Sequence, residues 1–125
     1  RPGENLALDA VSGVDGRSYI TYVLKEEGQV VYVGRASGVG TPREVLAARI
    51  AKGHDYMKAG ISPEVIAIQR TKMASQGAEE FFMQGYRELG MLIRNDENAL
   101  SFANAARTQK SLAKIEAFFG ELFAK

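Results

Sequence analysis

The segment from Tyr19 to Gly34 reads YITYVLKEEGQVVYVG and constrains the fold more than any other part of the chain. Two runs rich in β-branched and aromatic residues flank a Glu-Glu-Gly turn, a pattern typical of a β-hairpin. We expect strands over Tyr19–Lys25 and Gln29–Gly34. The turn is predicted to be a three-residue loop, Glu26–Gly28, because glycine suits the left-handed position at the end of such a loop.

Two tyrosines, Tyr22 and Tyr32, stand on the strands of this hairpin. With the three-residue loop they face each other across the strands, so both hydroxyls project from one face of the sheet. A two-residue loop at Glu27–Gly28 would shift the register by one residue and send the two side chains to opposite faces. Because tyrosine is a good strand residue, the pair by itself is also compatible with simple packing.

Composition narrows the class of protein. The 125 residues, 46% apolar and 25% charged, suit one globular domain with a single core. Cysteine is absent, which excludes disulfides, thiolate metal sites and a cysteine nucleophile. Since His54 is the single histidine, a multi-histidine zinc site is also excluded, and any metal would be a hard cation on oxygen ligands. No apolar run is long enough to span a bilayer, and no signal peptide is recognisable.

The first sixteen residues show weak periodicity and predict a linker or entry segment, with the folded domain over residues 17–125. Because the chain starts at Arg1 rather than at methionine, we expect it to be part of a longer polypeptide.

Basic side chains gather in the middle of the chain. Between residues 31 and 73 there are seven basic residues against three acidic ones, whereas the flanking stretch 74–105 is acidic. A phosphate-binding face is compatible with this pattern but is not required by it.

The stretch after the hairpin predicts a glycine-rich loop over Arg35–Thr41 and then a helix. Thr41 is the expected N-cap, with Pro42 at the first helical position and Glu44 completing a capping box. The helix should bury a stripe of Val45, Leu46 and Ile50 and stop at Gly53.

A third strand is expected over Pro63–Thr71, followed by helices over Ser75–Leu89 and Thr108–Ala124 with an irregular stretch, Asn95–Ala106, between them. The order β-β-α-β-α-α predicts an α+β fold with a small three-stranded antiparallel sheet flanked by helices. The inward stripes of the last two helices are predicted as Phe82, Met83, Tyr86 and Leu89, and as Leu112, Ile115, Phe119 and Leu122.

Two charged residues fall near these apolar stripes. Arg49 lies at the edge of the first helix's stripe, where an arginine either reaches solvent or presents its guanidinium to an anion. Glu79 falls on the inward side of the second helix, whereas Glu80 shares the polar side. An inward carboxylate needs a cation, a metal or hydrogen bonds, and a salt bridge to Arg49 or Arg70 is the simplest partner.

These residues, in this order, resemble the GIY-YIG nuclease domain over about Tyr19 to Asn104, and in particular the branch found as C-terminal toxin domains of polymorphic bacterial toxins. Ile-Thr-Tyr at 20–22 stands in place of the first motif, and Tyr-Val-Gly at 32–34 matches the second. The family's helix arginine, histidine or tyrosine, metal-binding glutamate and late asparagine correspond to Arg49, His54, Glu79 and Asn98.

The resemblance implies a metal-dependent endonuclease that hydrolyses phosphodiester bonds in DNA. Glu79 would then hold Mg²⁺ or Mn²⁺, and Tyr22 would act as general base or orient the water, its pKa lowered by a nearby cation. Arg49 would stabilise the transition-state charge, and Tyr32 and His54 would orient the water or bind the phosphate. Further contacts to the nucleic-acid backbone are expected from Arg35, Lys52, Lys58, Arg70 and Asn98.

As a toxin domain, the chain would be a monomer delivered into target bacterial cells and neutralised by a cognate immunity protein. Three alternatives stay open on the sequence: a toxin of the same fold that cleaves RNA, a repair or recombination nuclease, and a non-catalytic nucleic-acid-binding module. A glutamate locked in a dry salt bridge, with no cleft beside it, would favour the last of these.

Overall fold

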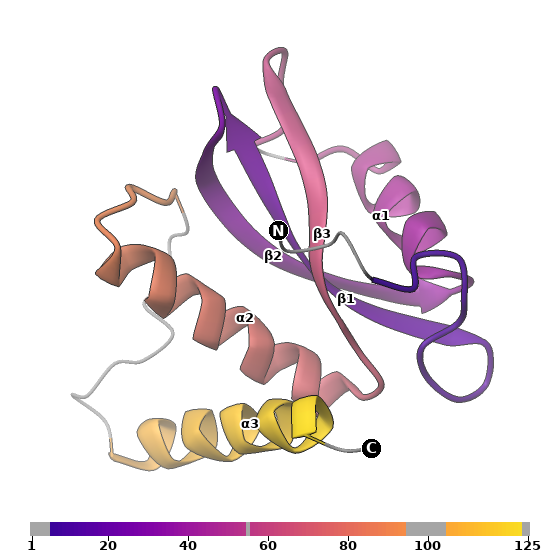
Figure 1. Cartoon of the computed structure of the whole chain (residues 1–125), viewed down its shortest axis with the longest axis vertical. Helices are drawn as coiled ribbons and strands as arrows, with labels where there is room; N and C mark the ends of the chain where they lie inside the picture. Colours follow the sequence, from indigo (N-terminus) through magenta and orange to yellow (C-terminus); the bar gives the residue numbers. More distant parts are fainter. Residues whose placement is uncertain (1–5, 55, 95–104, 124–125) are drawn as a thin grey trace.

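The computed structural model describes residues 6–54, 56–94 and 105–123, with side chains for residues 6–54, 56–94 and 112–122. Its elements are β1 (Arg17–Glu26), β2 (Gln29–Val39), α1 (Pro42–Ala51), β3 (Ile61–Gln69), α2 (Lys72–Glu88) and α3 (Ala105–Phe123). The strands form one antiparallel sheet in the order β2-β1-β3. Figure 1 shows α1 on one side of this sheet and α2, with α3 beside it, on the other. The predicted α+β class and element order are therefore confirmed.

The hairpin differs from the prediction in its loop. Glu26 pairs with Gln29, so the loop has two residues, Glu27 and Gly28, both with positive φ (52° and 78°). The predicted three-residue loop is wrong because two left-handed residues in a row give a turn whose twist matches the strands.

A β-bulge restores the face on which the tyrosines lie. The register between β1 and β2 shifts at Leu24, which pairs with Tyr32, so that Val31 has no partner in β1. Tyr22 consequently pairs with Gly34 rather than with Tyr32. One extra residue in β2 cancels the shift that the two-residue loop introduces, and both tyrosines lie on the α1 side with ring centroids 6.4 Å apart. The expected shared face is confirmed, but the direct pairing is wrong.

Strand β2 runs five residues beyond its predicted end, through Val39. Residues 35–39 pair with β1, which itself begins earlier than expected, at Arg17. The prediction of a loop over Arg35–Thr41 is wrong for these residues, because cross-strand pairing outweighs the low strand preference of glycine.

Local sequence signals place the helices well. Thr41 caps α1, and its side chain and that of Glu44 form the predicted capping box. Gly53, with a φ of 90°, follows the helix as expected. Helix α2 begins three residues earlier than predicted, because the hydroxyl of Thr71 accepts the backbone N–H of Ala74.

Each side of the sheet carries its own apolar cluster. On the α1 side the buried members include Ile20, Tyr22, Leu24, Val45 and Val65. On the α2 side they are Val23, Val30, Val33 and Ile66, with Phe82 and Tyr86 packed against them.

Three predicted core positions on α2 and α3 are wrong. Leu89, Leu112 and Leu122 have exposed fractions of 76%, 51% and 55%, whereas Phe118, which was not predicted, is buried. Leu89 is the C-cap of α2 and so lies beyond its last inward turn. In α3 the buried position is rotated to Phe118, which packs against Phe81 and Phe82 of α2.

The segment before β1 is fixed against the domain. Leu6 and Leu8 pack on the α1-side cluster, and the Leu8 carbonyl accepts the backbone N–H of Arg43. The Ser12 hydroxyl donates to the Gln69 carbonyl at 2.7 Å. Among the described residues, no helix is both long and apolar enough to cross a membrane.

Candidate functional site

A group of ring side chains lies on the α1 side of the sheet; we call Tyr22, Tyr32, His54 and Tyr56 the tyrosine–histidine cluster. Tyr22 and Tyr32 come from the hairpin, and the other two from the turn between α1 and β3. The Tyr22 hydroxyl lies 2.8 Å from His54 Nε2. The His54 ring lies edge-on to the Tyr32 ring, with 4.7 Å between their centroids. The Tyr56 ring stacks on Tyr32 with 4.9 Å between the centroids.

Gly34 makes room for this cluster. A Cβ at position 34 would lie 2.5 Å from Cζ of Tyr22 and 2.8 Å from Cε2 of Tyr32. Real Cβ atoms do not approach other atoms so closely, so only glycine lets the Tyr22 ring lie across β2.

The hydrogen bonds of His54 indicate which nitrogen of the neutral ring carries the proton. Its Nδ1 accepts the backbone N–H of Tyr56 at 3.2 Å and therefore carries no proton. The proton of the neutral ring is then on Nε2, and we assign the 2.8 Å contact as Nε2–H donating to the Tyr22 oxygen. The backbone of Tyr56 thus sets the direction in which His54 acts on Tyr22.

Tyr22 is almost wholly buried, and this raises its pKa to about 12. Burial is the largest cause, and the charge of an ionised Tyr32 adds to it; Arg49 opposes the shift, chiefly by its charge. The expectation of a lowered pKa is therefore wrong for the protein by itself, since burial outweighs the nearby cation. Tyr22 is protonated near neutral pH.

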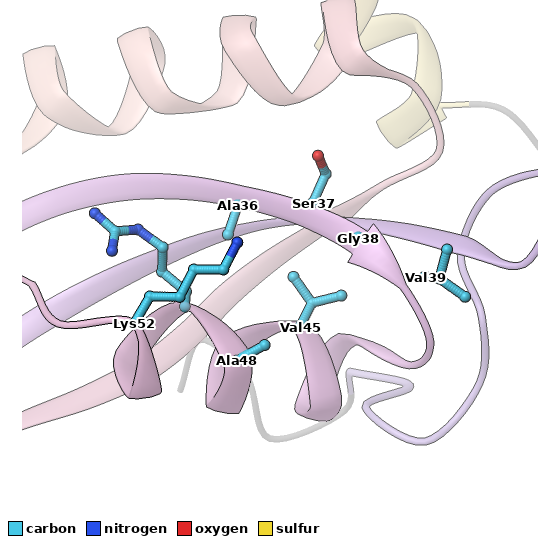
Figure 2. A pocket seen from close by; sticks show the side chains of 8 residues that line it. Ala36, Ser37, Gly38, Val39, Val45, Ala48 and Lys52 are labelled. Carbon is cyan, nitrogen blue, oxygen red and sulfur yellow. The ribbon is translucent and has the colours of Figure 1, made fainter.

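Arg49 links the cluster to a groove between α1 and the second half of β2. Its guanidinium Nη1 donates to the Gly53 carbonyl at 3.1 Å, while the side chain also lines the groove. The groove has a volume of about 270 Å³ and is bounded by Ala36–Val39, Val45, Ala48, Arg49 and Lys52. Figure 2 shows the Lys52 side chain extending from α1 toward β2. Two cations and no acid line the groove, so it suits an anionic ligand.

Glu79 lies on α2 and pairs with Arg35 of β2, whose Nε is 3.6 Å from its Oε1. Arg35 is the residue after Gly34, and strand alternation turns it to the α2 side with Val33. The predicted partners Arg49 and Arg70 are therefore wrong. Burial raises the pKa of Glu79, and Arg35 opposes this shift more than Lys114 does.

The cluster and the Arg35–Glu79 pair lie on different sides of β2, yet they interact. The Glu79 carboxylate raises the pKa of Tyr22, as the smallest of five contributions. β2 is an edge strand of the sheet, and in it Arg35 directly follows Gly34, against which the rings of Tyr22 and Tyr32 lie.

The donor set around Glu79 fits a divalent cation only in a weak site. Among the described residues, no three His, Asp or Glu side chains come together. A cation would therefore have one carboxylate ligand, and water and substrate oxygens would fill its other positions, as magnesium sites commonly allow. The Glu79 side chain is 25% exposed and so within reach of solvent.

The other predicted contacts are scattered. Lys58 is exposed in the turn before β3, and its carbonyl accepts the N–H of Ile61. Arg70 is exposed beyond the end of β3, where its backbone N–H donates to Glu121 of α3. Asn98 lies outside the described residues.

Sequence reasoning missed Tyr56. Its position two residues after His54 was the available signal, because a backbone N–H at that distance reaches back to the imidazole.

In comparisons with known proteins, no family model, no curated protein and no solved structure matches the chain.

Proposed function

We propose that this domain is a metal-dependent endonuclease of the GIY-YIG type that hydrolyses phosphodiester bonds in DNA. The observation that carries the proposal is the convergence of Tyr22, Tyr32, Arg49 and His54 beside a groove whose charged lining residues are the cations Arg49 and Lys52. Arg49, whose charge acts on Tyr22, is the residue that connects the cluster with this groove, and a guanidinium in a groove suits a phosphate.

The hydrogen-bond inventory of Tyr22 suggests its role. His54 donates to its oxygen, so its own O–H and a second lone pair remain to offer. In the resting arrangement the phenol would donate to a phosphoryl oxygen or to the attacking water. The second lone pair of the Tyr22 oxygen would accept a hydrogen bond from that water. A raised pKa favours this orienting role over that of a general base at neutral pH.

Arg49 would bind the phosphoryl oxygens on which negative charge develops. Lys52, on the same groove, would contact the backbone of the nucleic acid. Loss of one preorganised donor of this kind costs roughly 10²–10³-fold in rate.

Glu79 is the ligand proposed for Mg²⁺ or Mn²⁺, which when bound supplies Lewis-acid activation of the phosphoryl group. Arg35 beside it would contact a phosphate. We further propose, from the resemblance alone, that the domain is a toxin delivered into bacterial cells, that an immunity protein neutralises it, and that it acts as a monomer.

Plasmid cleavage by the purified domain, with Mg²⁺ or with EDTA, tests this function. We expect Mg²⁺-dependent nicking that falls by about 10²-fold or more in Arg49→Ala and Glu79→Ala. Glu80→Ala, one residue along α2, is the matched control and should keep most of the activity. Intact plasmid with a folded wild-type protein would reject DNA hydrolysis; cleavage of RNA in the same assay would move the proposal to an RNase.

A second candidate function is a non-catalytic nucleic-acid-binding module. It is favoured by the burial of Tyr22 and by the engagement of Glu79 with Arg35. It predicts salt-dependent binding of DNA that Arg49→Ala weakens, with no cleavage under any metal condition.

A further inference from the structure

The Arg35–Glu79 pair is looser than other ion pairs of the domain. Its Nε–Oε1 distance of 3.6 Å is too long for a good hydrogen bond. Arg94 and Glu26, by contrast, meet at 2.7 Å with a similar degree of side-chain exposure. Because both members of the Arg35–Glu79 pair are partly exposed, at 34% and 25%, a ligand can reach them. A pair of this kind contributes little stability and so costs little to exchange.

The position of Arg35 gives it access to both parts of the site. It follows Gly34, over which the rings of Tyr22 and Tyr32 lie. Its strand, β2, is the edge of the sheet, so a long side chain can pass around that edge to either side. A guanidinium on this edge is therefore placed between the carboxylate of Glu79 and a nucleic-acid backbone bound near the cluster.

We propose that Arg35 is a positioning residue that exchanges between Glu79 and a substrate phosphate. In the free protein its guanidinium holds Glu79; when nucleic acid binds, a phosphate takes the guanidinium and leaves the carboxylate open to a divalent cation. The metal and the nucleic acid consequently bind with positive cooperativity. This inference rests on the proposed function and adds an order of assembly to it.

Elementary electrostatics supports the exchange. A guanidinium beside a carboxylate opposes a second cation at the same oxygens. Phosphate is a ligand that the planar guanidinium binds through two parallel hydrogen bonds, which a pair at 3.6 Å does not provide. Transfer of Arg35 to phosphate thus removes the competitor for the metal and adds a contact to the substrate in one step.

Mn²⁺ binding, followed by the electron paramagnetic resonance signal of the free ion, tests the proposal without a cleavage readout. The probes are Mn²⁺ alone and Mn²⁺ with a short phosphorothioate DNA duplex that resists hydrolysis. For the wild type we expect the duplex to tighten Mn²⁺ binding by roughly 5-fold or more, the lower range of allosteric coupling. By linkage, Mn²⁺ should tighten binding of the duplex by the same factor.

Arg35→Gln separates this account from a purely structural role. Without the duplex, this variant should bind Mn²⁺ about 5-fold more tightly than wild type does. Addition of the duplex should raise its Mn²⁺ affinity by less than about 2-fold. Arg35→Lys, which keeps the charge, should bind Mn²⁺ alone as weakly as wild type. Arg94→Gln is the matched control, because it removes an equally exposed arginine from another ion pair, and it should behave as wild type. Circular dichroism checks that each variant is folded.

The outcomes distinguish two failures. If Glu79→Gln abolishes Mn²⁺ binding but Arg35→Gln matches wild type with and without the duplex, the exchange is refuted and the proposed metal ligand stands. If Glu79→Gln leaves Mn²⁺ binding unchanged, the metal role of Glu79 falls, and the exchange falls with it.

Discussion

The two parts of the site are built in opposite ways. On the α1 side, Tyr22 and His54 are buried and hydrogen-bonded to each other at 2.8 Å, and the backbone N–H of Tyr56 holds the other ring nitrogen of His54. On the α2 side, Arg35 and Glu79 are partly exposed and meet at 3.6 Å. Breaking a hydrogen bond between buried groups is costly because water cannot replace it, whereas a partly exposed pair can change partners at little cost. The tyrosine–histidine cluster is therefore preformed, whereas the Arg35–Glu79 pair is open to exchange.

The largest loss of stability is expected where α3 packs against α2. Phe118→Ala empties a position that is 2% exposed between Phe81 and Phe82 and should reduce the free energy of unfolding by about 3–5 kcal/mol. Leu112→Ala, at a position 51% exposed on the same helix, should cost less than about 1 kcal/mol. Urea unfolding monitored by circular dichroism measures both. Equal losses would mean that α3 does not pack through Phe118.

A smaller loss of stability is expected at Gly34, where the α1 side of the sheet is tightly packed. Gly34→Ala places a methyl group against the rings of Tyr22 and Tyr32 and should cost about 1–3 kcal/mol. As a control, Gly85→Ala in α2 has no neighbour within 4 Å of its added Cβ and should stabilise the protein by about 0.5–1 kcal/mol. The same unfolding curves compare the two. A neutral Gly34→Ala would show that the Tyr22 ring does not lie across β2.

The smallest effect concerns pH. Burial raises the pKa of Tyr22 from 10.0 to about 12, so above pH 10 the unfolded chain loses a proton that the folded protein keeps. The contribution of this shift to the free energy of unfolding is fully present below pH 10. It declines as the pH rises, by about 1 kcal/mol at pH 11. Unfolding of wild type and Tyr22→Phe at pH 9 and pH 11 measures it, because the variant lacks this decline. An identical pH dependence for both proteins would contradict the burial of an un-ionised Tyr22.

Short-range chemistry explains what the sequence predicts well. The capping box of Thr41 and Glu44 and the left-handed Gly53 depend only on neighbouring residues, and both were found as predicted. The hairpin loop was predicted wrongly, because its length is tied to the bulge at Val31 in the pairing of β1 with β2. That two errors in register cancel, and leave Tyr22 and Tyr32 on one face, cannot be inferred from local propensity.

Site residues show the same limit. Helical phase predicted that Glu79 points inward, but its partner Arg35 depended on the extension of β2 into a segment expected to be a loop. Tyr56 was missed because both of its contacts, the ring stacked on Tyr32 and the N–H donated to His54, depend on the shape of the turn that carries it.

Removing one hydroxyl on each side of the sheet tests most directly whether the tyrosine–histidine cluster takes part in phosphodiester hydrolysis. Tyr22→Phe and Tyr86→Phe each remove one oxygen, the first from the tyrosine–histidine cluster and the second from the α2 side, and both are assayed for Mg²⁺-dependent nicking of supercoiled plasmid. We expect Tyr22→Phe to lower the nicking rate by about 10²-fold or more, as loss of a preorganised hydrogen bond does, and Tyr86→Phe to stay within about 2-fold of wild type. Equal rates for the two variants, or a folded wild-type domain that nicks no DNA, would contradict this role of the cluster.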